Sequence, residues 1–136
     1  MSAKEYKKAL VLHRLERART TLADAQTLYK TGGSTASIVN RAYYSMFYAA
    51  LALLAAVDRE TSKHTGVLAL FDQLFVKTKI LPKEMSKMLR AAFDARQTGD
   101  YEDSALLSME AAGEILGFAE EFVESTEKRL LRGDIT

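Results

Sequence analysis

The sequence predicts an all-α protein, an antiparallel up-and-down bundle of about five helices. The chain of 136 residues has one proline and seven glycines, so few points interrupt a helix. Apolar residues recur at spacings of three and four along the chain, and no segment alternates with the period of a strand. Helices joined by short connectors are typical of an antiparallel bundle. The length predicts a single domain over residues 1–136.

The first helix is expected from about Lys4 to Lys30. A basic last turn followed by Gly32 and Gly33 is a common helix end, because glycine readily adopts the left-handed backbone that stops the helix. The helix carries an apolar seam that would face the core. The seam consists of Val11, Leu15, Ala18, Leu22, Ala25 and Tyr29.

The central helix of the bundle is expected to follow, from a cap at Ser34 or Thr35 to about Val57. Residues 40–54 hold a single charge, Arg41, among large apolar side chains. A surface helix would present a broad charged face, so we expect neighbours to cover most of this helix. Spacings of four, three and four place a polar set on one stripe of it. This set is Ser37, Arg41, Tyr44 and Tyr48.

Three further helices complete the prediction. Ser62 is expected to cap the third helix, and Pro82 is expected in the first turn of the fourth. The buried stripe of the fourth helix leads to Arg96. Residues 97–100 are typical of a turn, and Asp100 is expected to cap the last helix.

Composition excludes several classes of function. A net charge of +1 excludes a strongly basic nucleic-acid binder. No apolar stretch is long enough to span a membrane, and a chain without cysteine fits a reducing compartment, so we expect a cytoplasmic protein. Cysteine nucleophiles are excluded, and the two histidines lack the spacing of metal ligands. We therefore expect no metal ion and no cofactor.

Polar side chains that interrupt the apolar seams form the candidate site. Arginine offers a planar five-donor fork suited to phosphate, tyrosine offers a stacking face, and histidine exchanges protons near neutral pH. Such groups suit a nucleotide or an RNA strand. The predicted ligand-binding residues are Arg41, Tyr44, Arg96, Asp100 and Tyr101, and the candidates for catalysis are Arg96, Tyr101 and His64.

Structural roles for the same side chains stay open at this point. Arg41 and Arg96 could pair with carboxylates such as Asp100 and pin the helices together. The tyrosines of the central helix could equally lie in the core or in a dimer interface with their hydroxyls satisfied.

Four short segments, in order, resemble the HEPN domain family (higher eukaryotes and prokaryotes nucleotide-binding), in particular its short stand-alone prokaryotic group. Residues 40–50 read Asn-Arg-Ala-Tyr-Tyr-Ser-Met-Phe-Tyr-Ala-Ala, and residues 63–67 read Lys-His-Thr-Gly-Val. Phe-Val-Lys follows at 75–77 and Arg-Gln-Thr-Gly-Asp-Tyr at 96–101. The resemblance covers roughly residues 6–125.

The resemblance implies a helical bundle that commonly forms a homodimer and is often encoded beside a minimal nucleotidyltransferase, as toxin and antitoxin. For many such domains the resemblance implies a metal-independent RNase that uses an arginine and a histidine separated by four to six residues. In this chain Arg96 is followed by Tyr101, and no later histidine exists. Tyrosine, with a pKa near 10, is a poor base at neutral pH.

The resemblance therefore implies a weakly catalytic or non-catalytic protein that binds a nucleotide, RNA or a nucleotidyltransferase partner. One alternative is a metal-independent endoribonuclease toxin in which His64 replaces the missing histidine. Another is a purely structural dimer module whose polar residues stabilise the fold.

Overall fold

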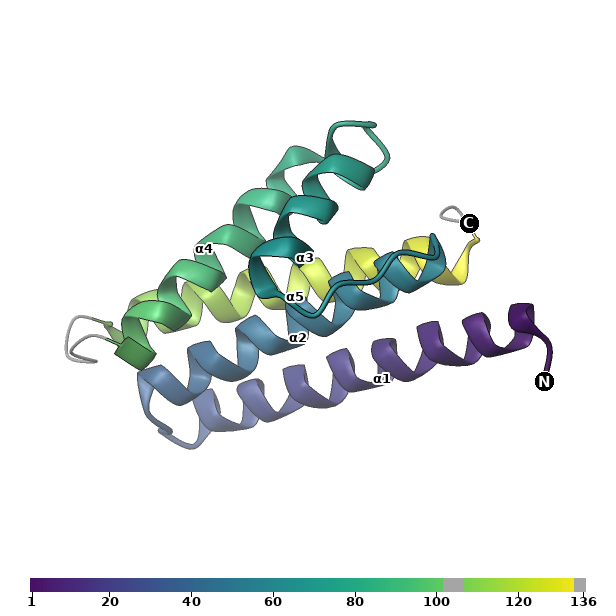
Figure 1. The fold of residues 1–136 in the computed structure, drawn as a ribbon. Helices are drawn as coiled ribbons and strands as arrows, with labels where there is room; N and C mark the ends of the chain where they lie inside the picture. The colour runs from purple at the N-terminus through teal and green to yellow at the C-terminus, as the bar shows by residue number, and fades with distance from the viewer. Residues whose placement is uncertain (102–106, 134–136) are drawn as a thin grey trace.

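The structure is a computed structural model that describes residues 1–101 and 107–133, with the backbone alone at 100 and 101. All its regular elements are helical, which confirms the predicted all-α bundle (Figure 1). Among the described residues, none of the helices is both long enough and apolar enough to cross a membrane. The elements are α1 (Ala3–Lys30), α2 (Thr35–Ala56), α3 (His64–Phe71), the π-helix η1 (Asp72–Val76), α4 (Lys83–Tyr101) and α5 (Met109–Leu131).

Helix α2 is the centre of the bundle, as its low charge predicts. Fourteen of its 22 residues are buried, and it contacts α1, α3, α4 and α5. Its partly exposed residues include the predicted stripe of Ser37, Arg41, Tyr44 and Tyr48. The sequence spacing therefore identified the one polar face of an otherwise buried helix.

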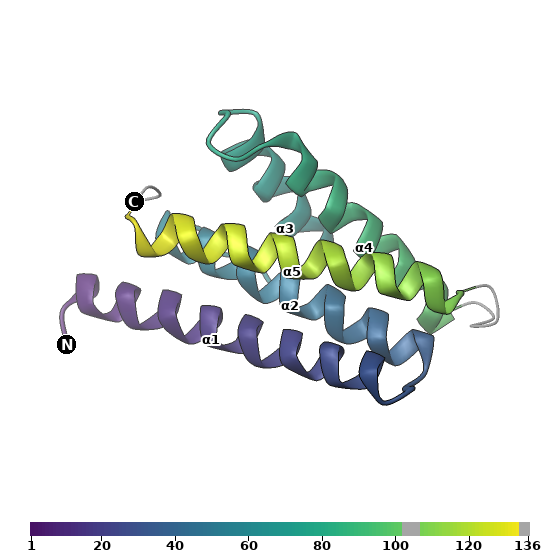
Figure 2. The same ribbon diagram turned by 180° about the vertical axis from the view of Figure 1, so that it is seen from behind.

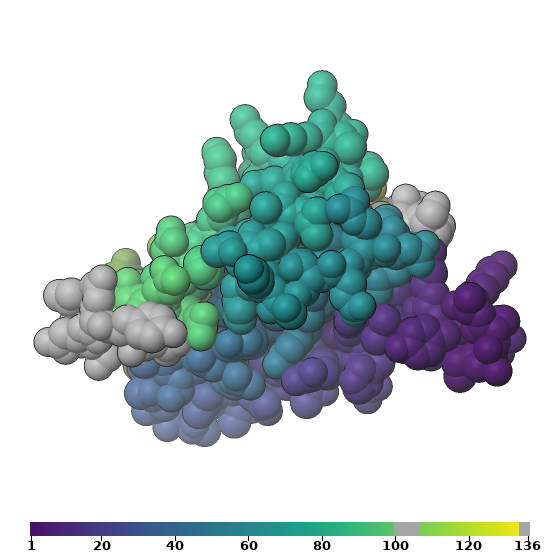
Figure 3. Space-filling view, viewed as in Figure 1, coloured from purple at the N-terminus to yellow at the C-terminus, as the bar shows by residue number. Residues whose placement is uncertain are grey.

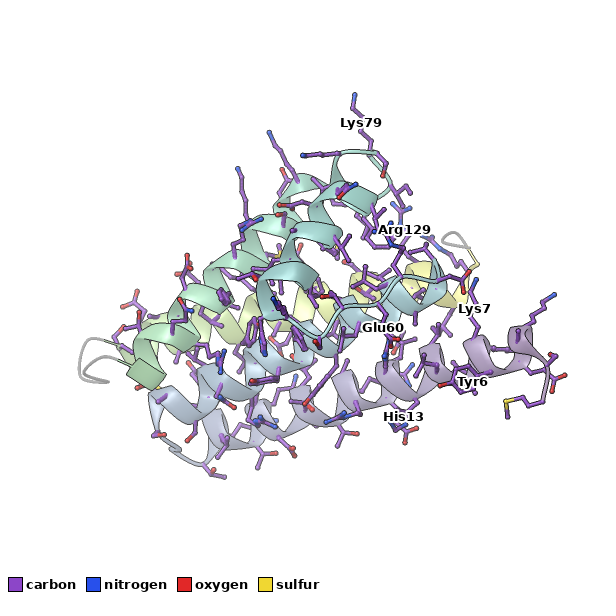
Figure 4. The ribbon with its side chains drawn as sticks, viewed as in Figure 1. Tyr6, Lys7, His13, Glu60, Lys79 and Arg129 are labelled. Carbon is purple, nitrogen blue, oxygen red and sulfur yellow. The ribbon has the colours of Figure 1, made fainter. Side chains whose placement is uncertain are left out.

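Helices α1, α2 and α5 lie side by side, while α3 and α4 form an inclined hairpin against them (Figures 1 and 2). The start of α1 and the end of α5 lie at the same end of the bundle, and the α1–α2 connector lies at the other (Figure 1). In the space-filling view the far end of the hairpin projects from the rest of the molecule (Figure 3). Lys79 marks that end (Figure 4).

A residue with left-handed backbone conformation follows each of the helices α1 and α2. Gly32, with φ of 77°, follows α1, and the amide of Gly33 donates to the carbonyl of Leu28 at 2.7 Å, as predicted for a glycine stop. Asp58 has φ of 58° after α2, and the amide of Arg59 donates to the carbonyl of Leu54 at 2.9 Å. Each of these left-handed residues ends its helix.

The predicted turn at residues 97–100 is wrong, because α4 continues through it to Tyr101. Glycine is unfavourable inside a helix, but tertiary packing overrides this preference here. A Cβ added at Gly99 would lie 3.3 Å from the Cβ of Ala36, so the absence of a side chain allows α4 to approach the start of α2 closely. Asp100 therefore does not cap the last helix. Ser108 caps α5 instead, and its side chain accepts from the amide of Ala111.

Two smaller boundary predictions are also corrected. Lys63, not Ser62, precedes α3, and no side chain caps that helix. Pro82 lies immediately before α4 rather than within its first turn, and its carbonyl accepts from the amide of Met85 at 3.1 Å. Boundary shifts of one residue leave the arrangement of the helices unchanged.

The hairpin of α3 and α4 is held together by a polar contact between η1 and α4. Asp72 accepts hydrogen bonds from Arg90, at 2.6 Å, and from Ser86. Partial burial would raise the pKa of Asp72, but the hydrogen bonds from Arg90 and Ser86 outweigh it and lower that pKa. Because η1 directly continues α3, this contact orients α3, which begins at His64, relative to α4, which carries Arg96.

Candidate functional site

Tyr43, on α2, is the side chain on which the candidate site is built. Its exposed fraction is 0%, and it is among the largest fully buried side chains. Its ring centroid lies 5.3 Å from that of Tyr44, 5.9 Å from Phe47 and 5.8 Å from Phe93 on α4. These contacts lie at the typical separations of edge and tilted aromatic pairs, so the ring fixes α2 against α4.

His64, the first residue of α3, packs onto this aromatic cluster. Its Nδ1 and the hydroxyl of Tyr43 are joined by a hydrogen bond of 2.7 Å. The imidazole also stacks on Phe47, with ring centroids 4.4 Å apart and an angle of 19° between the planes. Since Tyr43 occupies Nδ1, Nε2 is the nitrogen of His64 left for other partners. The other histidine, His13, is exposed on α1 (Figure 4).

Two guanidinium groups converge on the ring of Tyr44. The Cζ atom of Arg96, from α4, and the Cζ atom of Arg41, from α2, each lie 5.3 Å from the Tyr44 ring centroid. Arg96 also lies 5.7 Å from the centroid of Tyr43. All three contacts are within the range of cation–π attraction. The ring of His64 meets that of Tyr44 edge-on at 5.7 Å.

Arg41 is oriented by its neighbour in the chain. Its Nε and Nη2 donate to Oδ1 of Asn40 at 3.1 Å and 2.9 Å. Because the side-chain amide of Asn40 is neutral, it does not neutralise the positive charge of Arg41. Over the described part of the chain, no carboxylate forms an ion pair with Arg41. A shallow hollow of about 400 Å³ opens beside it, lined by Leu28, Ala36, Ser37, Asn40 and Arg41.

The structure thus brings together four of the predicted residues, Arg41, Tyr44, His64 and Arg96. They come from α2, α3 and α4, far apart in the sequence. Asp100 and Tyr101 end α4 one turn beyond Arg96, and their side chains lie outside the described residues. A pairing of Arg96 with Asp100 therefore stays a prediction. No group of three or more metal-ligating side chains occurs among the residues that are described.

The surroundings of His64 favour the neutral form of its imidazole. Its pKa is lowered below 6.5, first by burial and then by the positive charge of Arg96. Burial also raises the pKa of Tyr43, which stays a neutral phenol although the charge of Arg96 acts in the opposite direction. The site therefore combines two permanent cations with two neutral hydrogen-bonding side chains, a favourable environment for an anion.

The lowered pKa of His64 predicts a pH dependence of stability. The unfolded chain binds a proton at this side chain near pH 6.5, while the folded chain resists protonation to a lower pH. The free energy of unfolding should therefore fall as the pH drops below about 6.5. His64→Gln removes this contribution. In urea denaturation, the difference in free energy of unfolding between wild type and variant should therefore become smaller as the pH is lowered from 7.5 to 5. A difference that stays constant would contradict the assignment.

Sequence reasoning underestimated Tyr43 and overlooked Arg17. Tyr43 lies in the central apolar segment, where it is indistinguishable from a core residue until its contact with His64 is known. The Cζ atom of Arg17, on α1, lies 4.2 Å from the centroid of the Tyr48 ring. No local signal could have identified that contact, because the two residues are 31 positions apart.

Comparison with known proteins identifies one family and several relatives. Residues 11–130 match the sequence model of a family described as the HEPN domain. A protein of Thermotoga maritima named "UPF0332 protein" is 39% identical over 122 residues, which cover 90% of this chain and 92% of that protein.

Two relatives from Methanocaldococcus jannaschii are each named "Putative toxin". One is 34% identical over 121 residues, covering 89% of this chain and 82% of the relative. The other is 32% identical over 92 residues, covering 68% of each chain.

Proposed function

The chain belongs to the HEPN domain family, and on this basis we propose that it has a toxin-like role that depends on binding RNA or a nucleotide. The binding site comprises Arg41, Tyr44 and Arg96, with His64 at its edge. In this proposal the two guanidinium groups hold a phosphate, and the ring of Tyr44 contacts the ribose or base.

One observation carries the proposal, the convergence of Arg41 and Arg96 on a single tyrosine ring. Each guanidinium group carries a permanent positive charge, and both lie 5.3 Å from the same ring centroid. In this proposal a phosphate bound at the ring accepts charge-assisted hydrogen bonds from the two guanidinium groups. In the described part of the chain the hydroxyl of Tyr44 has no hydrogen-bond partner, so it can donate to the same ligand.

Direct binding measurements test the proposal. The probes are a fluorescent single-stranded octanucleotide with 2′-O-methyl riboses, which cannot be cleaved through the 2′-hydroxyl, and a mononucleotide. We expect saturable binding of both in the presence of a chelator, weakening as salt increases. Absence of saturable binding at low salt would contradict the proposal.

A second candidate, a metal-independent endoribonuclease, is favoured by the position of His64 beside Arg96. In the tautomer whose Nδ1–H donates to the Tyr43 oxygen, the neutral imidazole of His64 presents Nε2 as a proton acceptor for a ribose 2′-hydroxyl. Arg96 would then stabilise the charge that develops on the phosphate. In this arrangement His64 would carry the proton in place of the motif histidine, whose position Tyr101 occupies in this chain.

Cleavage of unmodified structured RNA in the presence of a chelator tests this second candidate. We expect any activity of the protein to fall by about 10²- to 10⁴-fold in His64→Gln, the usual contribution of general acid–base catalysis. His13→Gln is the matched control, because His13 is exposed on α1. Activity that survives in His64→Gln would exclude His64 as the proton carrier.

The expected homodimer and the expected nucleotidyltransferase partner stay predictions of the family resemblance. Sedimentation velocity of the purified protein tests the first. Co-purification with a co-expressed minimal nucleotidyltransferase encoded next to the gene tests the second.

A further inference from the structure

The contacts between arginine and tyrosine continue beyond the candidate site towards α1. The ring of Tyr48 lies 5.9 Å from that of Tyr44, one turn further along α2. Arg17 stacks on Tyr48 with its Cζ 4.2 Å from the ring centroid, and its Nη2 donates to the Tyr48 hydroxyl at 3.0 Å. We name this continuous row the arginine–tyrosine track, comprising Arg17, Tyr48, Tyr44, Arg41 and Arg96.

Arg17 differs from the arginines on either side of it in α1. Arg14 pairs with Glu60 at 2.8 Å, on the connector after α2 (Figure 4), and Arg19 pairs with Glu127 on α5. Among the described residues, no carboxylate forms an ion pair with Arg17. Its charge is therefore not neutralised, and one donated hydrogen bond leaves most of its five N–H groups available.

The track has the composition of a single-strand binding surface. Tyrosine faces stack on bases of any sequence, and guanidinium groups placed between them contact the backbone phosphates. A mononucleotide on Tyr44 would contact Arg41 and Arg96 but would leave Arg17 without a ligand. A strand of two or more nucleotides along α2 would use both ends of the track.

We propose that Arg17 and Tyr48 form a second phosphate subsite and that the ligand is a single-stranded oligonucleotide. This inference rests on the anion-binding function proposed above. It adds a specific claim. Arg17, on α1, should strengthen the binding of an oligonucleotide but not that of a mononucleotide.

The test compares Arg17→Gln with Arg19→Gln, which removes the same charge from the same helix. The probes are the 2′-O-methyl octanucleotide and the mononucleotide, each titrated at several salt concentrations. We expect Arg17→Gln to weaken octanucleotide binding by roughly three- to tenfold, a modest effect because the side chain is exposed. The slope of log affinity against log salt should fall by about 0.7 for one lost phosphate contact. Mononucleotide binding should be unchanged, and Arg19→Gln should bind both probes like wild type.

Several outcomes would overturn the inference. If Arg17→Gln weakened the binding of both probes equally, Arg17 would act on the site formed by Arg41, Tyr44 and Arg96. If Arg17→Gln and Arg19→Gln bound both probes alike, Arg17 would contact no phosphate. Loss of a dimer in Arg17→Gln, seen by sedimentation velocity, would assign the track to contact between two copies of the chain. Failure of the proposed function is distinguishable, because Arg96→Gln would then leave the binding of both probes unchanged.

Discussion

Arg96→Gln is expected to weaken binding of both the mononucleotide and the octanucleotide by about 10- to 100-fold. The reason is the loss of one charge-assisted hydrogen-bonding group, which contributes about 1.5–3 kcal/mol. Glutamine keeps the first part of the side chain and a polar end, but it removes the charge and the guanidinium group that contacts the tyrosine rings. Fluorescence anisotropy with the probes described above measures the loss.

The control for this prediction is Arg59→Gln, an exposed arginine after the far end of α2. It should bind like wild type. Thermal unfolding distinguishes a binding role of Arg96 from a structural one, since a structural role predicts that Arg96→Gln lowers the melting temperature. Full binding by a folded Arg96→Gln, or loss of folding in that variant, would contradict the account.

Tyr43→Ala is expected to lower the free energy of unfolding by about 3–5 kcal/mol, the usual cost of removing a large buried aromatic side chain. The change leaves a cavity between α2 and α4 and removes the hydrogen bond to His64. Domains of this size are stable by only about 5–15 kcal/mol, so the variant should be close to unfolding at 37 °C. Urea denaturation measures the difference.

Two further variants divide this effect into its parts. Tyr43→Phe keeps the ring and should cost about 1–3 kcal/mol, because Nδ1 of His64 loses its partner. Tyr6→Ala removes the same kind of side chain at a position that is 62% exposed and should change stability by less than about 0.5 kcal/mol. A Tyr43→Ala variant as stable as Tyr6→Ala would contradict the buried position of Tyr43.

The fold and one face of the site were predictable because they depend on local spacing. The stripe of Ser37, Arg41, Tyr44 and Tyr48 follows from the helical period alone. The position of His64 was not predictable, since it depends on how the connector after α2 returns α3 to the middle of that helix.

The turn predicted at residues 97–100 shows the limit of local signals. Gly99 and Asp100 are typical of a turn, and the packing of Gly99 against Ala36 overrides that preference. Arg17 illustrates the same limit at the surface. Its position outside the apolar seam is typical of a solvated residue, and only the packing of α1 on α2 places it over Tyr48.

The central claim is that Arg41 and Arg96 form one anion site on Tyr44. NMR titration of the labelled protein with the mononucleotide, observed at the arginine Nε–H signals, tests it most directly. The signals of Arg41 and Arg96 should shift together with one dissociation constant, while that of Arg59 should not move. Unchanged Arg41 and Arg96 signals at saturating mononucleotide, or two unrelated dissociation constants for them, would contradict it.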